Sequence, residues 1–143
     1  MKLSAKAEYA CLAVLELALR HDQPEPARLV EIATPNGIPE RFLVQILLQL
    51  KGAGFVSSVR GAAGGYRLAI EPREISIWDV IQSVEGPLSA PVAANESNVT
   101  PGWQVLRNVW QETNLIEQEH LLQIHFAELA DRARSRNANM YYI

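Results

Sequence analysis

Apolar side chains recur at three- and four-residue spacing near the start of the chain, and this pattern predicts two helices. The first begins after Ser4, a typical N-cap residue, and should end near Arg20. Its apolar positions are Ala7, Ala10, Val14, Leu17 and Ala18. A loop is expected at 21–26 and a short helix over 27–34, ended by the TPNG stretch at 34–37.

A third helix is predicted over residues 39–51, where Pro39 suits the first turn. Its apolar residues fall on one side of the helix: Phe42, Leu43, Ile46, Leu47 and Leu50. The side away from them offers Glu40, Arg41, Val44 and Gln45. Gly52 and Gly54 end the helix.

From Phe55 onward the period of the pattern changes to two, which predicts β-strands. The first is FVSSVR (55–60). In the second, YRLAI (66–70), one face carries Tyr66, Leu68 and Ile70 and the other carries Arg67 and Ala69. Between them, the stretch VRGAAGGYRLA (59–69) holds three glycines in five positions. Glycine accepts the positive φ of a tight turn, so a β-hairpin is expected here.

The last third of the chain predicts a fourth helix over 77–85, capped by Ser76, then a loop over 86–102 and a long helical pattern from Trp103 to about Arg134. A helix this long and apolar has little of its own chain to pack on, so a partner helix from a second subunit is expected. The alternative is that it folds back on the N-terminal domain. The residues expected to make the dimer contact are Trp103, Leu106, Val109, Trp110 and Ile116.

These elements predict a mainly α-helical fold with one small β-hairpin. We expect one domain over 1–85 that includes the helix at 77–85, then the loop over 86–102, and a dimerisation helix with a C-terminal tail over 103–143. No apolar run approaches the roughly 18 residues that a membrane span needs. The single cysteine, Cys11, excludes an internal disulfide framework, and a reducing, cytoplasmic setting is expected.

Charge is divided unevenly along the chain, whose net charge is −3. Residues 1–67 hold eight basic and six acidic side chains (net +2), whereas residues 68–143 hold five basic and ten acidic ones (net −5). The first half therefore tolerates a polyanion better than the second.

The glycine-rich stretch has two interpretations, a phosphate-binding loop for a nucleotide cofactor or the turn of a hairpin. A Walker loop requires Lys-Ser/Thr after its last glycine, and a dinucleotide fingerprint requires a helix there. Here Gly65 is followed by the predicted strand YRLAI, so no helix N-terminus is available for a pyrophosphate. The hairpin interpretation is therefore favoured, and no cofactor is expected.

Helix, short helix, turn, helix and hairpin, in this order, are typical of a winged helix-turn-helix, which binds double-stranded DNA. On the third helix, Arg41 suits guanine and Gln45 suits adenine. A thin hairpin tip allows Arg60 to approach a minor groove. The candidates for phosphate contact are Lys6, Lys51, Ser57 and Ser58.

No catalytic or metal-binding arrangement emerges from the remaining residues. His120 and His125 are five residues apart and lie on different helix faces, and His21 is far from both. No Ser-His-Asp or paired-carboxylate arrangement is evident, so we expect neither an enzyme nor a metal site.

Three blocks of the chain resemble the Rrf2 family of bacterial transcription regulators, the group with IscR-, NsrR- and CymR-type proteins. They are MKLSAKAEYACLAVLELAL, GIPERFLVQILLQLKGAGFVSSVRGAAGGYRLA and ISIWDVIQSVEGPL, and residues 109–133 resemble the family's long dimerisation helix and the segment after it. The resemblance implies a homodimeric winged-helix protein, usually a repressor, that binds a partly palindromic site.

The resemblance also assigns residues to roles. It places Ser4, Lys6 and Tyr9 in a phosphate-contacting segment and Arg41, Val44 and Gln45 at base-facing positions of the recognition helix. The positions that match the family's wing are Ser58, Arg60, Gly61, Gly64 and Gly65. Val44 departs from the family pattern, because several members carry an acidic residue there; an apolar side chain suggests contact with a thymine methyl or looser discrimination.

A larger departure concerns the three cysteines that many members place between the fourth helix and the dimerisation helix to hold an iron–sulfur cluster. Residues 86–109 contain no cysteine and no histidine, so the family's cluster-based sensing should not be transferred. Three alternatives for the signal stay open: a small molecule, a protein partner, or no ligand. The alternative function is a winged-helix module that binds a partner enzyme and has lost specific DNA binding, which Val44 and the acidic net charge favour.

Overall fold

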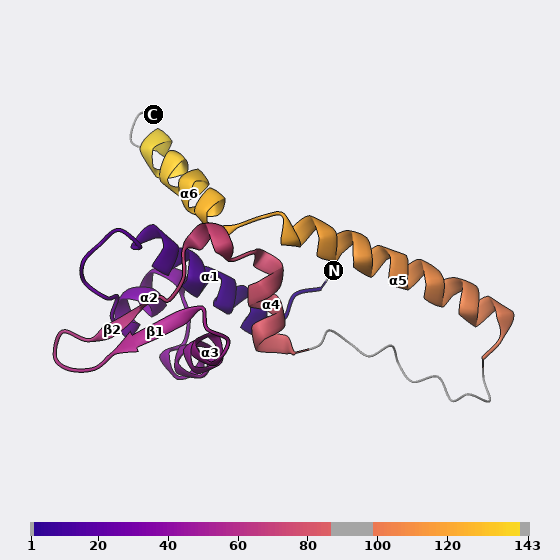
Figure 1. The fold of residues 1–143 in the computed structure, drawn as a ribbon, viewed down its shortest axis with the longest axis horizontal. Helices are drawn as coiled ribbons and strands as arrows, with labels where there is room; N and C mark the ends of the chain where they lie inside the picture. The colour runs from indigo at the N-terminus through magenta and orange to yellow at the C-terminus, as the bar shows by residue number, and fades with distance from the viewer. Residues whose placement is uncertain (1, 87–98, 141–143) are drawn as a thin grey trace.

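The computed structural model describes residues 2–86 and 99–140 of the chain. Figure 1 shows a body of helices with a two-stranded hairpin at one side, from which the long helix α5 projects away. The last helix, α6, begins at the body, where it packs against α1, and extends outward to the C-terminal end. The predicted fold class, mainly helical with a small hairpin, is confirmed.

The first helix, α1 (Ala5–Leu19), lies at the centre of the body and packs against α2, α3, α4 and α6. It begins as predicted, because the Ser4 hydroxyl accepts a hydrogen bond of 3.1 Å from the Ala7 amide. Ala7, Ala10 and Ala13 are fully buried, and their small side chains leave room for the neighbouring helices.

The second and third helices, α2 (Leu29–Asn36) and α3 (Glu40–Gly52), form a helix-turn-helix pair. The helix expected over 27–34 begins and ends two residues later, so that Pro35 lies in its last turn and Gly37 caps it. Pro39 is the N-cap of α3, with extended backbone, and does not lie in the first turn. The amphipathic pattern of α3 is confirmed, since Leu43, Ile46, Leu47 and Leu50 are all buried.

Two antiparallel strands, β1 (Val56–Val59) and β2 (Gly65–Leu68), form the predicted hairpin. Val56 pairs with Leu68 at its base and Val59 with Gly65 near its tip. The outer edge of β2 pairs with Ala27: the Tyr66 amide donates to the Ala27 carbonyl at 2.7 Å, and the Ala27 amide donates to the Tyr66 carbonyl at 2.8 Å. The segment before α2 therefore lies along β2 and holds the hairpin against the body.

A short 3₁₀ turn, η1 (Pro72–Glu74), leads into α4 (Ile77–Glu85). Ser76 caps α4 as predicted, and its side chain and that of Asp79 form a reciprocal capping box. Val80, Ile81 and Val84 of α4 are buried in the same core as the buried faces of α1 and α3. The loop expected over 86–102 lies mostly outside the described residues.

The helical pattern expected from Trp103 to about Arg134 is two helices in the structure, α5 (Pro101–Leu122) and α6 (Phe126–Met140). Between them, the Ile77 amide donates to the Ile124 carbonyl at 3.0 Å, and the Phe126 amide donates to the Ile75 carbonyl at 3.0 Å. These two bonds replace the intrahelical bonds that a continuous helix would make. The prediction of one continuous helix from Trp103 to about Arg134 is therefore wrong.

The two halves of this segment have different environments. Along α6, Phe126 and Ala130 join the core next to α1 and η1, so this half does fold back on the N-terminal body. No residue of α5 is buried, although it runs for 22 residues. Within the described residues, no helix is long and apolar enough to cross a membrane.

Candidate nucleic-acid interface

The outer side of α3 carries four exposed side chains on successive turns of the helix. We call them the recognition face: Arg41, Val44, Gln45 and Leu48. Three of them are base-contact candidates from the sequence, and Glu40, also exposed, lies at the start of the same helix. The core-facing residues of α3 fix its orientation, so the recognition face is held outward by packing.

Tyr9, assigned to phosphate contact by the resemblance, is half-buried between α1 and α3. Its ring meets that of Phe42 edge to face, with centroids 5.6 Å apart and planes at 85°. In this structure Tyr9 positions α1 against the recognition helix.

The end of α3 and the first strand of the hairpin are joined by a hydrogen bond. Lys51 Nζ donates to Ser58 Oγ at 2.8 Å, so two of the phosphate-contact candidates lie side by side on the surface. Ser57 points to the other face of the strand and is half-buried opposite Arg67. An ammonium beside a hydroxyl is a suitable pair of donors for one phosphate oxygen.

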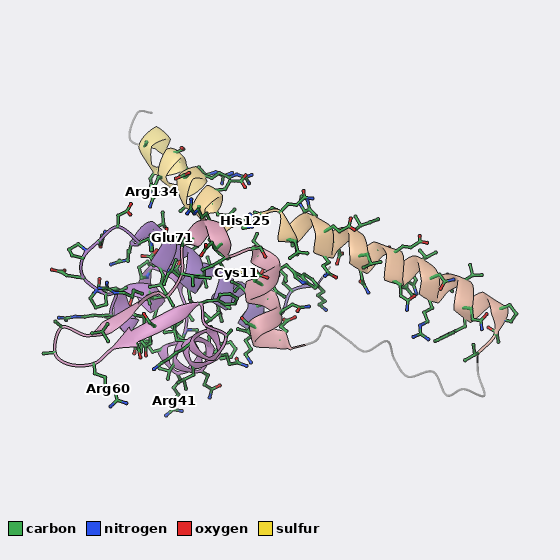
Figure 2. The ribbon with its side chains drawn as sticks, viewed as in Figure 1. Cys11, Arg41, Arg60, Glu71, His125 and Arg134 are labelled. Carbon is green, nitrogen blue, oxygen red and sulfur yellow. The ribbon has the colours of Figure 1, made fainter. Side chains whose placement is uncertain are left out.

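Arg60 lies at the tip of the hairpin and is exposed. Figure 2 shows that Arg60 and Arg41 project from the same edge of the body, although they come from the hairpin and from α3. Glu71 and Arg134 lie at the opposite edge. A polyanion along the first edge would meet both guanidinium groups.

The three glycines assigned to the wing have different roles. Gly61 has a φ of +111°, the positive value that the tight turn requires. Gly64 and Gly65 have no such conformation, but each has backbone atoms directly where a side chain would begin. The nearest is the Val59 carbonyl oxygen for Gly64 and the Ala27 carbonyl oxygen for Gly65. Gly64 and Gly65 therefore serve close packing within the hairpin and its base.

At the other end of the candidate interface, Ser4 is exposed and Lys6 is half-buried in the first turn of α1. Besides capping α1, the Ser4 hydroxyl donates a hydrogen bond to the carboxylate of Glu85, the last residue of α4. No local pattern indicates this contact, because the two residues are 81 positions apart.

All five residues expected at a dimer contact lie on α5. Leu106, Val109, Trp110 and Ile116 are exposed, and Trp103 is half-buried under the guanidinium of Arg107, 5.0 Å from the ring centroid. Val105 and Leu115 add to this exposed apolar surface. Contiguous exposed apolar surface on this scale marks an interaction site.

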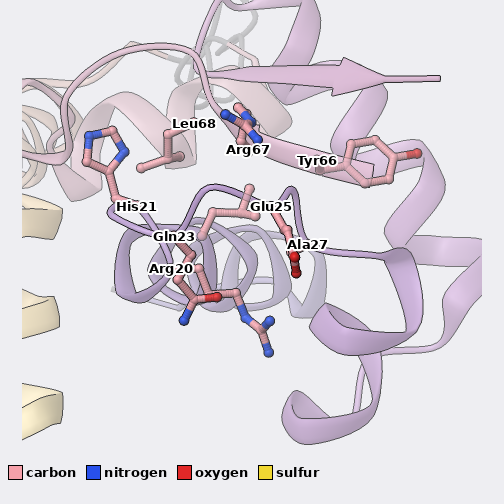
Figure 3. Close-up of a pocket in the computed structure, with 9 residues that line it drawn as sticks. Arg20, His21, Gln23, Glu25, Ala27, Tyr66, Arg67 and Leu68 are labelled. Carbon is pink, nitrogen blue, oxygen red and sulfur yellow. The ribbon is translucent and has the colours of Figure 1, made fainter. Parts of the chain in front are cut away.

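A shallow cavity of about 140 Å³ lies between the end of α1 and β2 (Figure 3). The two arginines that line it make contacts within the fold: Arg67 donates to the Pro24 carbonyl at 2.8 Å, and Arg20 pairs with Glu16 at 3.2 Å and Glu31 at 2.8 Å. Pockets for organic ligands are typically about 300–1,000 Å³, so this cavity is smaller than a typical site for an organic cofactor.

The residues of this chain do not fit an iron–sulfur cluster. The sequence holds one cysteine, and Cys11 lies within α1, where burial raises the pKa of its thiol to about 12 with smaller contributions from Glu8 and Glu85. A cluster ligand is a thiolate, which this environment disfavours. Among the described residues, no three His, Cys, Asp or Glu side chains are grouped to hold a metal ion.

A helix-turn-helix pair followed by an antiparallel hairpin defines the winged helix-turn-helix class. Comparison with known proteins agrees. Residues 3–132 match the model of the Rrf2 family, described as an iron-dependent transcriptional regulator. The chain belongs to the Rrf2 family of DNA-binding transcription regulators.

Individual relatives cover most of the chain. CymR of Bacillus subtilis, an HTH-type transcriptional regulator, is 35% identical over 144 residues, the whole of both chains. IscR of Aliivibrio salmonicida is 35% identical over 90% of this chain and 77% of its own. Among solved structures, that of B. subtilis CymR, the global cysteine regulator, superposes with a TM-score of 0.78 over 92% of this chain and 98% of its own, at 36% identity. IscR of T. potens gives a TM-score of 0.76 at 34% identity, over 93% and 88% of the two chains.

One residue of the recognition face was missed from the sequence. Leu48 belongs to the predicted helix, but it was assigned neither to the apolar side nor to the side away from it. The signal was available: at about 100° per residue, Leu48 lies almost directly opposite the buried residues of α3.

Proposed function

We propose that the protein is a homodimeric repressor that binds a partly palindromic operator without an iron–sulfur cluster. The observation that carries the proposal is the shared orientation of Arg41 on α3 and Arg60 on the hairpin tip (Figure 2). With this arrangement, α3 enters a major groove while the tip lies along the adjacent minor groove. Arg41, Val44 and Gln45 then face base edges.

Phosphate contacts flank this central region. Lys51 and Ser58, already joined by a hydrogen bond, form one such contact, and Ser4, Lys6 and Ser57 are assigned to others. Contacts with phosphate carry no sequence information but fix the position of α3 on the duplex. They also release counterions, so binding should weaken steeply with salt.

The dimer forms through α5 in this proposal. The support is its exposed apolar surface, which no described residue of the same chain covers along most of its length. A two-fold axis through paired α5 helices would present two copies of α3 to successive major grooves, about 34–36 Å apart. The acidic C-terminal half would face away from DNA, in a cytoplasmic, cluster-free protein.

DNA binding by the full-length protein tests the proposal. Electrophoretic mobility shifts on fragments of its own promoter region, at 50 and 200 mM salt, should give a specific, salt-sensitive complex with two protein chains per site. A reporter gene behind that promoter should be expressed more strongly when the protein is absent. A protein that shifts no fragment specifically, with or without cell extract, contradicts the proposal.

The second candidate is a winged-helix module that binds a partner protein with the recognition face. The exposed apolar side chains of Val44 and Leu48 favour it. Its signature would be a stoichiometric complex with an enzyme and no specific DNA affinity.

A further inference from the structure

Leu48 is the most exposed apolar side chain of α3, with 63% of its surface accessible, and Val44, one turn earlier, is 38% exposed. The four core leucine and isoleucine residues of the same helix are no more than 1% exposed. Leu48 follows Arg41 by seven residues, so the two side chains project in nearly the same direction. Leu48 is therefore at the middle of the surface that α3 presents outward.

An apolar pair at this position has few chemically suitable partners in a major groove. Of the groups that base pairs expose there, nearly all are hydrogen-bond donors or acceptors, and the C5-methyl group of thymine is the largest apolar one. Polar or charged side chains would gain hydrogen bonds on the groove floor, whereas Leu and Val gain only from an apolar contact.

The surroundings of the pair favour DNA over an apolar protein surface. Arg41 lies in line with Leu48 on the helix, and Lys51 follows Leu48 by three residues. Both carry positive charge, as does Arg60 on the same edge of the body. Apolar side chains flanked by cations complement a groove that has a methyl group between two phosphate strands.

We propose that Leu48, together with Val44, contacts thymine methyl groups in the major groove and makes the operator specific for A·T pairs at those positions. The inference rests on the proposed DNA binding and adds a specificity-determining residue to it. Arg41 and Gln45 then select the neighbouring base pairs by hydrogen bonds. Because thymine lies in only one strand of each pair, the contact also fixes the orientation of the A·T pair.

The test replaces thymine by uracil, which pairs with adenine in the same way but lacks the methyl group. The operator is first selected from random DNA with the wild-type protein, and each thymine in a half-site is then replaced singly by uracil. At one or two positions we expect about fourfold weaker binding by the wild-type protein, the change that corresponds to losing about 0.8 kcal/mol of apolar burial.

The variants Leu48→Ala and Val44→Ala assign the effect to the side chains. Each should bind the thymine operator more weakly and lose most of the difference between thymine and uracil at its own position. Val30→Ala on α2 is the matched control, since Val30 is an exposed valine outside α3, and it should retain the full difference. Thermal unfolding of all three variants should match the wild type, because the side chains are exposed.

The outcomes separate this inference from the function on which it rests. Failure to select any DNA sequence would overturn both. Specific binding without a uracil-sensitive position, or with sensitivity that persists in Leu48→Ala and Val44→Ala, would overturn the methyl contact and leave the DNA-binding function standing. A Leu48→Ala protein with unchanged DNA binding that no longer captures a protein partner would also overturn it.

Discussion

Gly65 lies against the backbone of Ala27, so that a Cβ atom on the glycine would come within 2.7 Å of the Ala27 carbonyl carbon. The two segments are held together by the paired hydrogen bonds between Ala27 and Tyr66. This contact ties the base of the hairpin to the segment that enters α2. It therefore sets where the hairpin tip, with Arg60, lies relative to the recognition helix.

Gly65→Ala should destabilise the protein by about 1–3 kcal/mol, because the added methyl group collides with backbone that has no room to move. Gly52→Ala is the control: nothing lies within 4 Å of its Cβ position, and alanine is the better helix former. Urea unfolding at a fixed protein concentration measures both. Equal stability of the two variants would contradict the close approach.

Phe126→Ala should lower the free energy of unfolding by about 3–5 kcal/mol. Phe126 is only 1% exposed and anchors α6 in the core beside α1, so the substitution leaves a cavity there. Phe126→Leu, which fills more of the space, should cost clearly less. If both variants unfold with the wild-type midpoint, α6 does not pack on the body as described.

An aspartate on the apolar side of α5 should dissociate the proposed dimer. Leu106→Asp and Ile116→Asp would each bury an unpaired carboxylate at the interface and raise the dimer dissociation constant by about tenfold or more. Gln111→Asp adds the same charge on the polar side of α5 and should leave the dimer intact. Sedimentation equilibrium distinguishes these results, and a monomeric wild-type protein would contradict the proposed interface.

Cys11 should react slowly with alkylating reagents. Burial raises its pKa to about 12, against about 8.5 for an unperturbed thiol, so little thiolate forms at pH 8. Alkylation by iodoacetamide at pH 8 should be at least about a hundredfold slower in the folded protein than in guanidinium chloride. A folded-state rate close to the denatured one would contradict this environment.

The same pKa shift should make stability depend on alkaline pH. The folded state holds the thiol proton more tightly than the unfolded state, so this contribution is complete below about pH 8.5 and is lost as the pH rises toward 12. Urea unfolding at pH 8 and pH 10 should show a decrease in stability that is smaller in Cys11→Ala. An identical decrease in both proteins would assign it to other groups.

Arg60→Ala and Arg41→Ala should affect DNA binding differently. Removing Arg60 from the hairpin tip should weaken binding to all sequences and reduce the salt dependence by about one counterion. Removing Arg41 from the recognition face should instead relax the base preference at one position, with a cost of about 1–3 kcal/mol there. Titrations of specific and random duplexes at several salt concentrations separate the two, and the reverse pattern would exchange the roles.

Much of the N-terminal body follows from the sequence because its signals are local. The Ser4 and Ser76 caps each depend on groups within three residues, and the outward direction of Arg41 follows from the period of α3. The change from a helical period to a period of two after Phe55 likewise located the hairpin. In each case the residues that make the structure are close together in the chain.

The features that the sequence did not predict depend on contacts between residues far apart in the chain. The break between α5 and α6 contains no glycine or proline, and it forms because Ile124 and Phe126 pair with the backbone next to Ser76. The contact of Ser4 with Glu85 is of the same kind. Leu48 is a different case, since its position in the helical period already placed it on the outer side of α3.

The sequence alone thus determined most of the elements, the side of α3 that is buried and the family to which the chain is similar, because periodicity and short motifs encode these locally. Only the tertiary structure decided that Gly65 serves packing against Ala27, that Phe126 brings α6 back to the core, and that α5 is left uncovered. Those outcomes depend on which surfaces meet in space, and the free energy of burying them is shared between residues that no local pattern connects.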